Sequence, residues 1–148
     1  DHILAVNQVA SKYNIDIYAS EEEERLLGDA ILNLSGGYRR DCVVEKYNKL
    51  GDGQELELAN IKFNTILTPG HTSGSMCYFI ENENVLFSGD MLFRESVGRT
   101  DFPTGSEEQI IESLNNKLMK LEDKVVVYPG HGPATTIGYE RVNNMYVR

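Results

Sequence analysis

The chain has 148 residues, enough for one compact domain with a hydrophobic core. Its formal net charge is -9, with 23 Asp and Glu against 14 Lys and Arg, and no basic stripe is visible that could neutralise nucleic-acid phosphates. No apolar run approaches the roughly 18–20 residues of a membrane helix. We therefore expect no nucleic-acid partner and no membrane association.

The first part of the chain predicts two helices around a short strand. Apolar residues recur at helical spacing from about residue 3 to 13, and residues 15–19 (IDIYA) are typical of a strand. Ser20 opens a capping-box pattern, which predicts a second helix with apolar residues as far as Leu34. Residues 35–53 are polar with glycine turns, so we expect a loop there.

The rest of the chain predicts several short strands and two helices. The strands are expected at residues 54–58, 61–68, 75–80, 85–87 and 125–128. Consecutive strands of this length are typical of antiparallel pairing. After a loop over residues 94–106, one helix is expected to begin at Ser106 and a last one at Glu140. This mixed order predicts an α/β or α+β fold.

Three apolar strands end in the same way, with a small turn followed by a side chain that can bind a metal. They are ILTPGH ending at His71, VLFSGD ending at Asp90, and VVVYPGH ending at His131. Glycine permits a sharp turn that aims the next side chain beyond the strand end. The remaining histidine of the chain, His2, stands next to Asp1. Neutral imidazole with carboxylate suits Zn, Fe or Mn, so we expect a metal site.

The order of these motifs resembles the metallo-β-lactamase superfamily, and the later motifs are similar to its compact glyoxalase II-like branch. The motifs are DH at the start, then PGHTSGS, SGDMLF, GRTDFP and YPGHGPATTIGYER. The resemblance covers essentially the whole chain and implies a single domain over residues 1–148 with an αββα sandwich. Asp1-His2 match only the last two positions of the family motif HxHxDH. We therefore expect an N-terminally truncated domain that lacks its first strands and two upstream histidines.

The resemblance also implies a site for two divalent metal ions, with Zn expected and Fe or Mn as alternatives. His71 would bind the first ion together with the two upstream histidines. Asp1, His2 and His131 would bind the second ion, and Asp90 would bridge the pair. Asp1 is a further candidate for orienting the attacking water, which would make it catalytic.

The activity that the resemblance implies is hydrolysis of a small thioester of the S-acylglutathione type by a metal-bridging hydroxide. The larger glyoxalase II enzymes carry a C-terminal helical extension that this sequence lacks, so another thioester or a lactone stays an alternative. An iron persulfide dioxygenase and an inactive fragment of such a protein are further alternatives. A β-lactamase is less expected, because the GRTDFP loop does not resemble the loop of those enzymes.

Arg99 has two interpretations. Its guanidinium suits a substrate carboxylate, and an internal ion pair with Asp101 is the alternative.

Location and assembly are predicted from weaker signals. The two cysteines are too few for a disulfide framework, and Cys77 lies in an apolar run typical of a core thiol. Reduced thiols fit a cytoplasmic protein. A truncated sheet exposes an unpaired edge, so a homodimer or strand exchange through that sheet is also expected.

Overall fold

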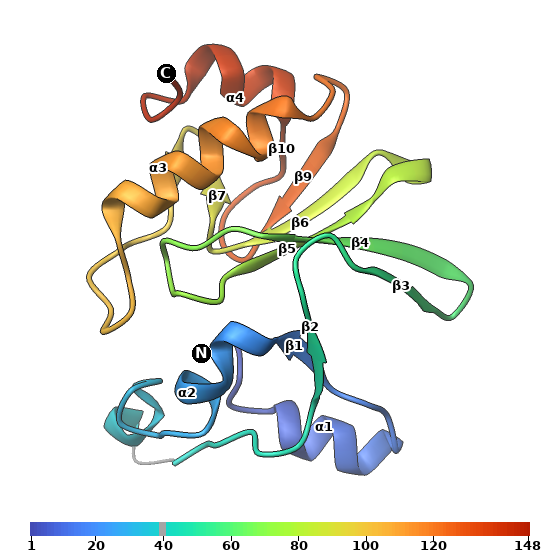
Figure 1. Cartoon of the computed structure of the whole chain (residues 1–148), viewed down its shortest axis with the longest axis vertical. Coiled ribbons are helices and arrows are strands. Elements are labelled where there is room, and N and C mark those ends of the chain that lie inside the picture. The colour runs from blue at the N-terminus through green and yellow to red at the C-terminus, as the bar shows by residue number, and fades with distance from the viewer. Residues whose placement is uncertain (39–40) are drawn as a thin grey trace. The chain divides into compact units, whose positions relative to one another are not determined.

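The computed structural model describes residues 1–38 and 41–148 and divides into two compact units, Asp1–Leu50 and Gly51–Arg148 (Figure 1). Its mixed helices and strands confirm the predicted α/β class. The prediction of a single domain over residues 1–148 stays a prediction.

The first unit is built from short elements. They are α1 (Val6–Tyr13), β1 (Tyr18–Ser20), η1 (Glu21–Glu23), α2 (Glu24–Leu27), η2 (Ser35–Tyr38) and β2 (Asn48–Leu50). β1 and β2 pair in parallel, with Tyr18 opposite Asn48. Among its described residues, the buried apolar side chains are Leu26, Cys42, Val44 and Leu50.

Two predictions for this unit are wrong: the length of the helix after Ser20 and the absence of a strand from residues 35–53. The helix after Ser20 has the predicted cap, since the Ser20 hydroxyl accepts a hydrogen bond from the Glu22 amide, but α2 ends at Leu27. The Asp29 carboxylate accepts from the amides of Ile31 and Leu32, and such side-chain turns compete with a helix. Ile31 is therefore 81% exposed instead of lying on a buried helical face.

Strand β2 lies inside the segment that the sequence predicted as loop. Its three residues alternate too briefly to give a periodic signal, and parallel pairing with the distant β1 specifies them instead. Residues 39–40 of that predicted loop lie outside the described residues.

The second unit holds a six-stranded sheet with the order β10-β9-β6-β5-β4-β3. Its strands are β3 (Glu55–Leu58), β4 (Ile61–Leu67), β5 (Met76–Ile80), β6 (Val85–Gly89), β9 (Val126–Pro129) and β10 (Thr135–Thr136). β3 to β6 form the predicted antiparallel series, whereas β6 and β9 are parallel. A small hairpin, β7 (Leu92–Phe93) and β8 (Ser96–Val97), follows β6, and its second strand lies in the predicted loop over residues 94–106.

The helices of this unit form one apolar layer with the sheet. They are α3 (Glu107–Asn116) and α4 (Ile137–Asn143), with η3 (Glu81–Glu83) and η4 (Leu118–Lys120) as short 3-10 turns. Figure 1 shows α3 and α4 on the same side of the sheet. The core consists of fully or nearly fully buried residues from both layers: Cys77, Leu86, Met91, Leu92, Ile110, Leu114, Leu118, Met119, Val125, Val127 and Ile137.

Cys77 is fully buried in this core, as predicted. Burial raises the pKa of its thiol to about 12, so it stays protonated and unreactive near neutral pH.

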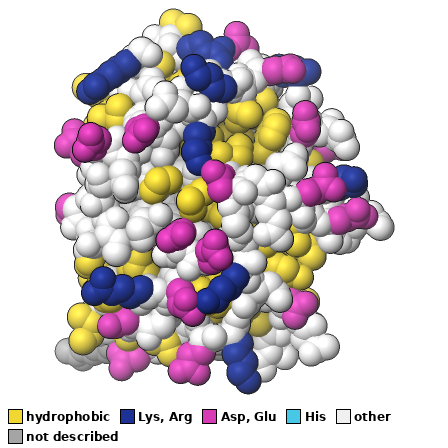
Figure 2. Space-filling model, viewed as in Figure 1, with side chains coloured by type: hydrophobic (Ala, Val, Ile, Leu, Met, Phe, Trp, Pro, Cys, Tyr) yellow, Lys and Arg dark blue, Asp and Glu magenta, His cyan; other side chains and the backbone are white. Residues whose placement is uncertain are grey.

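The surface carries both signs of charge. On the face shown in Figure 2, carboxylate side chains alternate with Lys and Arg side chains instead of forming blocks of one sign. Mixed charge of this kind favours solubility.

Candidate metal centre

His71 lies just beyond β4, after the turn Thr68-Pro69-Gly70. Gly70 has φ +145, and a Cβ there would meet the backbone of Ile110 on α3 at 2.4 Å, so only glycine permits this approach. The imidazole packs edge-on against the ring of Phe102, with centroids 4.9 Å apart. The turn therefore delivers a largely buried His71 side chain to a fixed position.

One hydrogen bond fixes which nitrogen of His71 is available. Nδ1 lies 2.8 Å from the backbone carbonyl oxygen of Arg99, which can only accept, so Nδ1 carries the proton in this contact. In the neutral ring, Nε2 then presents a lone pair. It faces Oδ2 of Asp90 at 3.7 Å. A histidine oriented by a carbonyl on its other nitrogen is typical of metal ligands.

Asp90 follows β6, whose register to β9 shifts between Phe87 and Gly89. Its side chain is only 14% exposed. The backbone of Gly98 lies against Asp90 so closely that a Cβ on Gly98 would come within 1.7 Å of the Asp90 carbonyl oxygen. A larger residue at position 98 would therefore displace the Asp90 segment.

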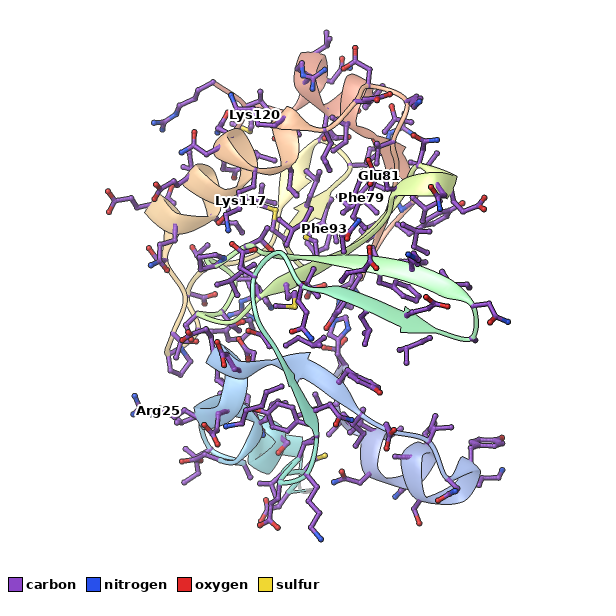
Figure 3. The ribbon with its side chains drawn as sticks, turned by 45° about the vertical axis from the view of Figure 1, so that its right-hand side comes forward. Arg25, Phe79, Glu81, Phe93, Lys117 and Lys120 are labelled. Carbon is purple, nitrogen blue, oxygen red and sulfur yellow. The ribbon has the colours of Figure 1, made fainter. Side chains whose placement is uncertain are left out.

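His131 follows β9, and the parallel pairing of β6 with β9 brings it next to Asp90, because parallel strands end at the same edge of a sheet. The amide of Gly130 donates to the carbonyl of Gly89 at 2.8 Å and ties the two turns together. His131 Nε2 lies 3.5 Å from Asp90 Oδ2. Phe93 of β7 (labelled in Figure 3) lies edge-on to the His131 ring, with centroids 6.1 Å apart.

The distances around Asp90 fit cation binding between its carboxylate and each imidazole. Ligand atoms about 2.1 Å from a tetrahedral ion lie about 3.4 Å apart. The two imidazole nitrogens stand 3.7 and 3.5 Å from the same carboxylate oxygen. A nitrogen lone pair and a carboxylate oxygen repel each other unless a proton or a metal ion lies between them. The donor set of this unit therefore fits a divalent metal of the zinc or iron type.

Asp1 and His2 belong to the other compact unit. Their side chains approach each other, with His2 Nε2 3.8 Å from Asp1 Oδ1, and both are about half exposed or more. Their joining with His131 in one metal site stays a prediction.

For Arg99 the structure contains the internal ion pair. Its Nε and Nη2 donate to the two carboxylate oxygens of Asp101 at 2.6 and 2.5 Å, and its guanidinium lies over the ring of Phe102. This pairing holds the pKa of Asp101 well below its usual range, at about 2. A role for Arg99 in holding a substrate carboxylate would require it to leave this pair.

Three contacts of the site were missed by sequence reasoning. They are the Arg99 carbonyl that orients His71, and the rings of Phe102 and Phe93 that lie against the two histidines. The two phenylalanines stand in the motifs GRTDFP and SGDMLF, which was the available signal. The carbonyl has no residue-type signal, because every residue carries one.

Fold and site together define a mixed α/β protein whose candidate metal-binding side chains lie just beyond strand ends, at one edge of a sheet. The family model of the metallo-beta-lactamase superfamily matches residues 1–131. The chain belongs to that superfamily.

Two curated relatives extend over nearly the whole chain. It is 37% identical to the probable metallo-hydrolase YqgX of Bacillus subtilis over 150 residues, covering 99% of this chain and 71% of the relative. It is 31% identical to the hydroxyacylglutathione hydrolase GloC of Haemophilus influenzae, with the same coverage.

Two solved structures share the fold closely. The crystal structure of BLEG-1 B3 metallo-beta-lactamase matches with a TM-score of 0.91 and 37% identity over 99% of this chain and 72% of that one. The structure of TTHA1623 in a di-iron-bound form matches with a TM-score of 0.84 and 29% identity over the same shares. The superfamily of metal-dependent hydrolases is thus established for this chain.

Among the described residues, no helix combines the length and the apolar character that crossing a membrane requires.

Proposed function

We propose that the chain is a metal-dependent hydrolase of small thioesters of the S-acylglutathione type. The convergence of His71 Nε2 and His131 Nε2 on Asp90 Oδ2 carries the metal-dependent part of the proposal. The likeness to a relative named hydroxyacylglutathione hydrolase supports the thioester part.

In this proposal His71, Asp90 and His131 are ligands from the second unit, and Asp1 and His2 complete the ligand set with His131. Two divalent ions are expected, with Zn first and Fe or Mn as alternatives. The di-iron form of TTHA1623 supports iron as one of these alternatives. A divalent ion at such a site lowers the pKa of bound water towards 7 and makes hydroxide available.

The protein's own groups have separate tasks. The Arg99 carbonyl holds the His71 ring so that Nε2 faces the centre, and the Phe93 and Phe102 rings restrict rotation of the two imidazoles. Asp1 is proposed to orient the attacking water through its carboxylate. A thioester suits this arrangement, because a thiolate leaves with little need for a general acid.

A β-lactam is the second candidate substrate. The 37% identity to BLEG-1, over 99% of this chain, favours testing it. Hydroxide made available at the same ligand set could also attack the amide carbonyl of a β-lactam, but the amine leaving group would then need a proton.

The deciding experiment measures metal content by elemental analysis and hydrolysis of S-lactoylglutathione and of a chromogenic cephalosporin. It is run on this chain and on a form extended upstream through two histidines that complete HxHxDH. Asp90→Asn is the site variant, and Lys62→Met, in an exposed ion pair with Glu55, is the control.

Bound divalent metal with thioester cleavage that Asp90→Asn abolishes supports the proposal. Cephalosporin cleavage without thioester cleavage would replace the substrate. A single bound iron with oxygen uptake on a persulfide would replace the reaction with the dioxygenase alternative. Absence of metal from both forms would refute the ligand set.

A further inference from the structure

The residue that ends β4, Leu67, lies where the neighbouring strand β3 no longer continues. Before this point the backbone of β4 is paired, since the Thr65 amide donates to the Gln54 carbonyl and the Gly53 amide donates to the Thr65 carbonyl. At Leu67 a side chain takes over: the Leu67 amide donates to Oδ1 of Asp52 at 2.7 Å. Asp52 thus replaces a strand partner at the last residue of β4.

Lys117, which follows the last residue of α3 and is labelled in Figure 3, binds both partners of this contact. Its ammonium donates to the Leu67 carbonyl at 2.6 Å and to Oδ2 of Asp52 at 2.7 Å. Both polar backbone groups of Leu67 are therefore held by one ion pair. Burial raises the pKa of Asp52, but the hydrogen bonds from Lys117 and Leu67 outweigh it and lower the pKa overall.

The next carbonyls of the turn are also held by α3 and its cap residues. The Ser113 hydroxyl donates to the Pro69 carbonyl at 2.8 Å, and the Ser106 amide donates to the Gly70 carbonyl at 2.8 Å. Ile110 packs against Gly70. Positions 106, 110, 113 and 117 are spaced by three or four residues, so they lie on one face of the helix. One helix face therefore contacts Leu67, Pro69 and Gly70 in the segment before His71.

We propose that this face of α3, with the Asp52–Lys117 pair as its polar clamp on Leu67, positions the His71 imidazole for metal binding. The inference rests on the proposed role of His71 as a ligand. Lys117 and Ser113 act through the backbone and touch no substrate, so they are positioning residues. A ligand must be held within about 0.5 Å of its productive place, and a strand end without its neighbour is too loose for that.

The experiment compares Lys117→Met with Lys117→Arg and Asp52→Asn in the full chain. Lys62→Met is the matched control, because Lys62 also pairs with a carboxylate across β3 and β4 but at the far end of these strands. Two signals are recorded: the affinity and visible absorption spectrum of added Co²⁺, and the His71 Nδ1–H resonance in the metal-free protein.

We expect Lys117→Met to weaken Co²⁺ binding roughly 10- to 100-fold, the usual effect of losing a contact that orients a ligand. The Co²⁺ absorption bands should shift, and the His71 Nδ1–H resonance should exchange faster with solvent. Asp52→Asn should show the same changes more weakly. Lys117→Arg should restore the spectrum, and Lys62→Met should match the parent.

Parent-like Co²⁺ affinity, spectrum and Nδ1–H exchange in Lys117→Met would overturn the inference. A general loss of folding in Lys117→Met is recognised by a changed far-ultraviolet circular dichroism spectrum. The milder Asp52→Asn then carries the test, and parent-like Co²⁺ binding and Nδ1–H exchange in a folded Asp52→Asn would overturn the inference. If His71→Ala leaves Co²⁺ binding unchanged, the ligand assignment fails instead. The Nδ1–H exchange in Lys117→Met still tests the clamp in that case, because it needs no metal.

Discussion

Asp90 is the residue on which the two histidines of the second unit converge, through its oxygen Oδ2. Asp90→Asn keeps the size of the side chain but removes its charge. Because a neutral amide is a poor ligand for a divalent ion, we expect metal affinity to fall by at least about 100-fold. Titration with Zn²⁺ against a chromogenic chelator measures this. Asp101→Asn, which changes a carboxylate paired with Arg99, serves as the control. An unchanged affinity in Asp90→Asn would remove Asp90 from the site.

Asp101 gives a prediction about pH at the same scale. Its pKa is lowered to about 2, first by the hydrogen bonds from Arg99. A lowered pKa means that the pair stabilises the fold above the unfolded value of about 4, and that this contribution is lost as pH falls towards 2. Arg99→Gln should return the pKa of Asp101 towards 4. Carboxyl ¹³C shifts followed by NMR between pH 1.5 and about 6 check it; an unmoved titration midpoint would show that another group holds the carboxylate.

Among the helices, α4 carries a carboxylate whose importance the sequence did not signal. Glu140 is fully buried, and its oxygens accept from the Thr135 hydroxyl, the Glu95 amide and the Asn144 side chain. Tyr139 also donates to Glu95. Through these bonds α4 holds the β7–β8 hairpin, which leads from Asp90 to the Gly98-Arg99 segment beside His71.

We expect Glu140→Ala to lower the free energy of unfolding by about 3 kcal/mol, because it leaves buried donors without an acceptor. Glu112→Ala, exposed on α3, should change it by less than about 0.5 kcal/mol. Urea unfolding followed by circular dichroism compares the two. Equal losses in both variants would mean that the Glu140 bonds do not contribute.

The elements that the sequence predicted well are those with a long periodic signal or a strong cap. β4 and β5 fall within one residue of their predicted ranges, and α3 begins where it was predicted, with the Ser106 hydroxyl as its cap. The helix after Ser20 was predicted too long, since apolar residues continue at helical spacing although the Asp29 turn has already ended it. β2, β7 and β8 have only two or three residues each, so their own sequence pattern gives no strand signal. Their pairing with another strand, β1 for β2 and each other for β7 and β8, defines them instead.

For the candidate site, residue types and strand ends were sufficient to single out His71, Asp90 and His131, whose side chains the structure brings together. Their role as metal ligands stays a prediction. What could not be predicted is how they are held. The Arg99 carbonyl beside His71, the Gly98 approach to Asp90 and the Lys117 contact with Leu67 each involve a backbone group. They depend on tertiary packing, which local sequence patterns do not encode.

For the whole molecule, the edges of the main sheet bear on self-association, and the homodimer prediction stays a proposal. The sheet ends at β3 and at the two-residue strand β10. β3 carries Glu55 and Glu57, and charges on an edge strand oppose pairing with another chain.

Glu57→Ile should therefore increase self-association, because it removes a charge and adds a β-branched side chain to this edge. Light scattering after size-exclusion chromatography measures the mass distribution. Glu83→Ile, which adds the same side chain on the turn η3, should leave it unchanged. If both variants associate equally, added hydrophobicity rather than the β3 edge is responsible.

The parallel pairing of β6 with β9 has a consequence for the order in which the candidate metal-binding side chains come together during folding. His71 and Asp90 are joined by a local meander of antiparallel strands, which closes early in folding because its contacts are near in sequence. His131 reaches them only after the whole α3 crossover has been laid down, and closing so long a loop is slow. If His71, Asp90 and His131 bind a metal ion as proposed, metal binding is a late event in folding that stabilises the crossover. A chelator should then first accelerate unfolding at β9.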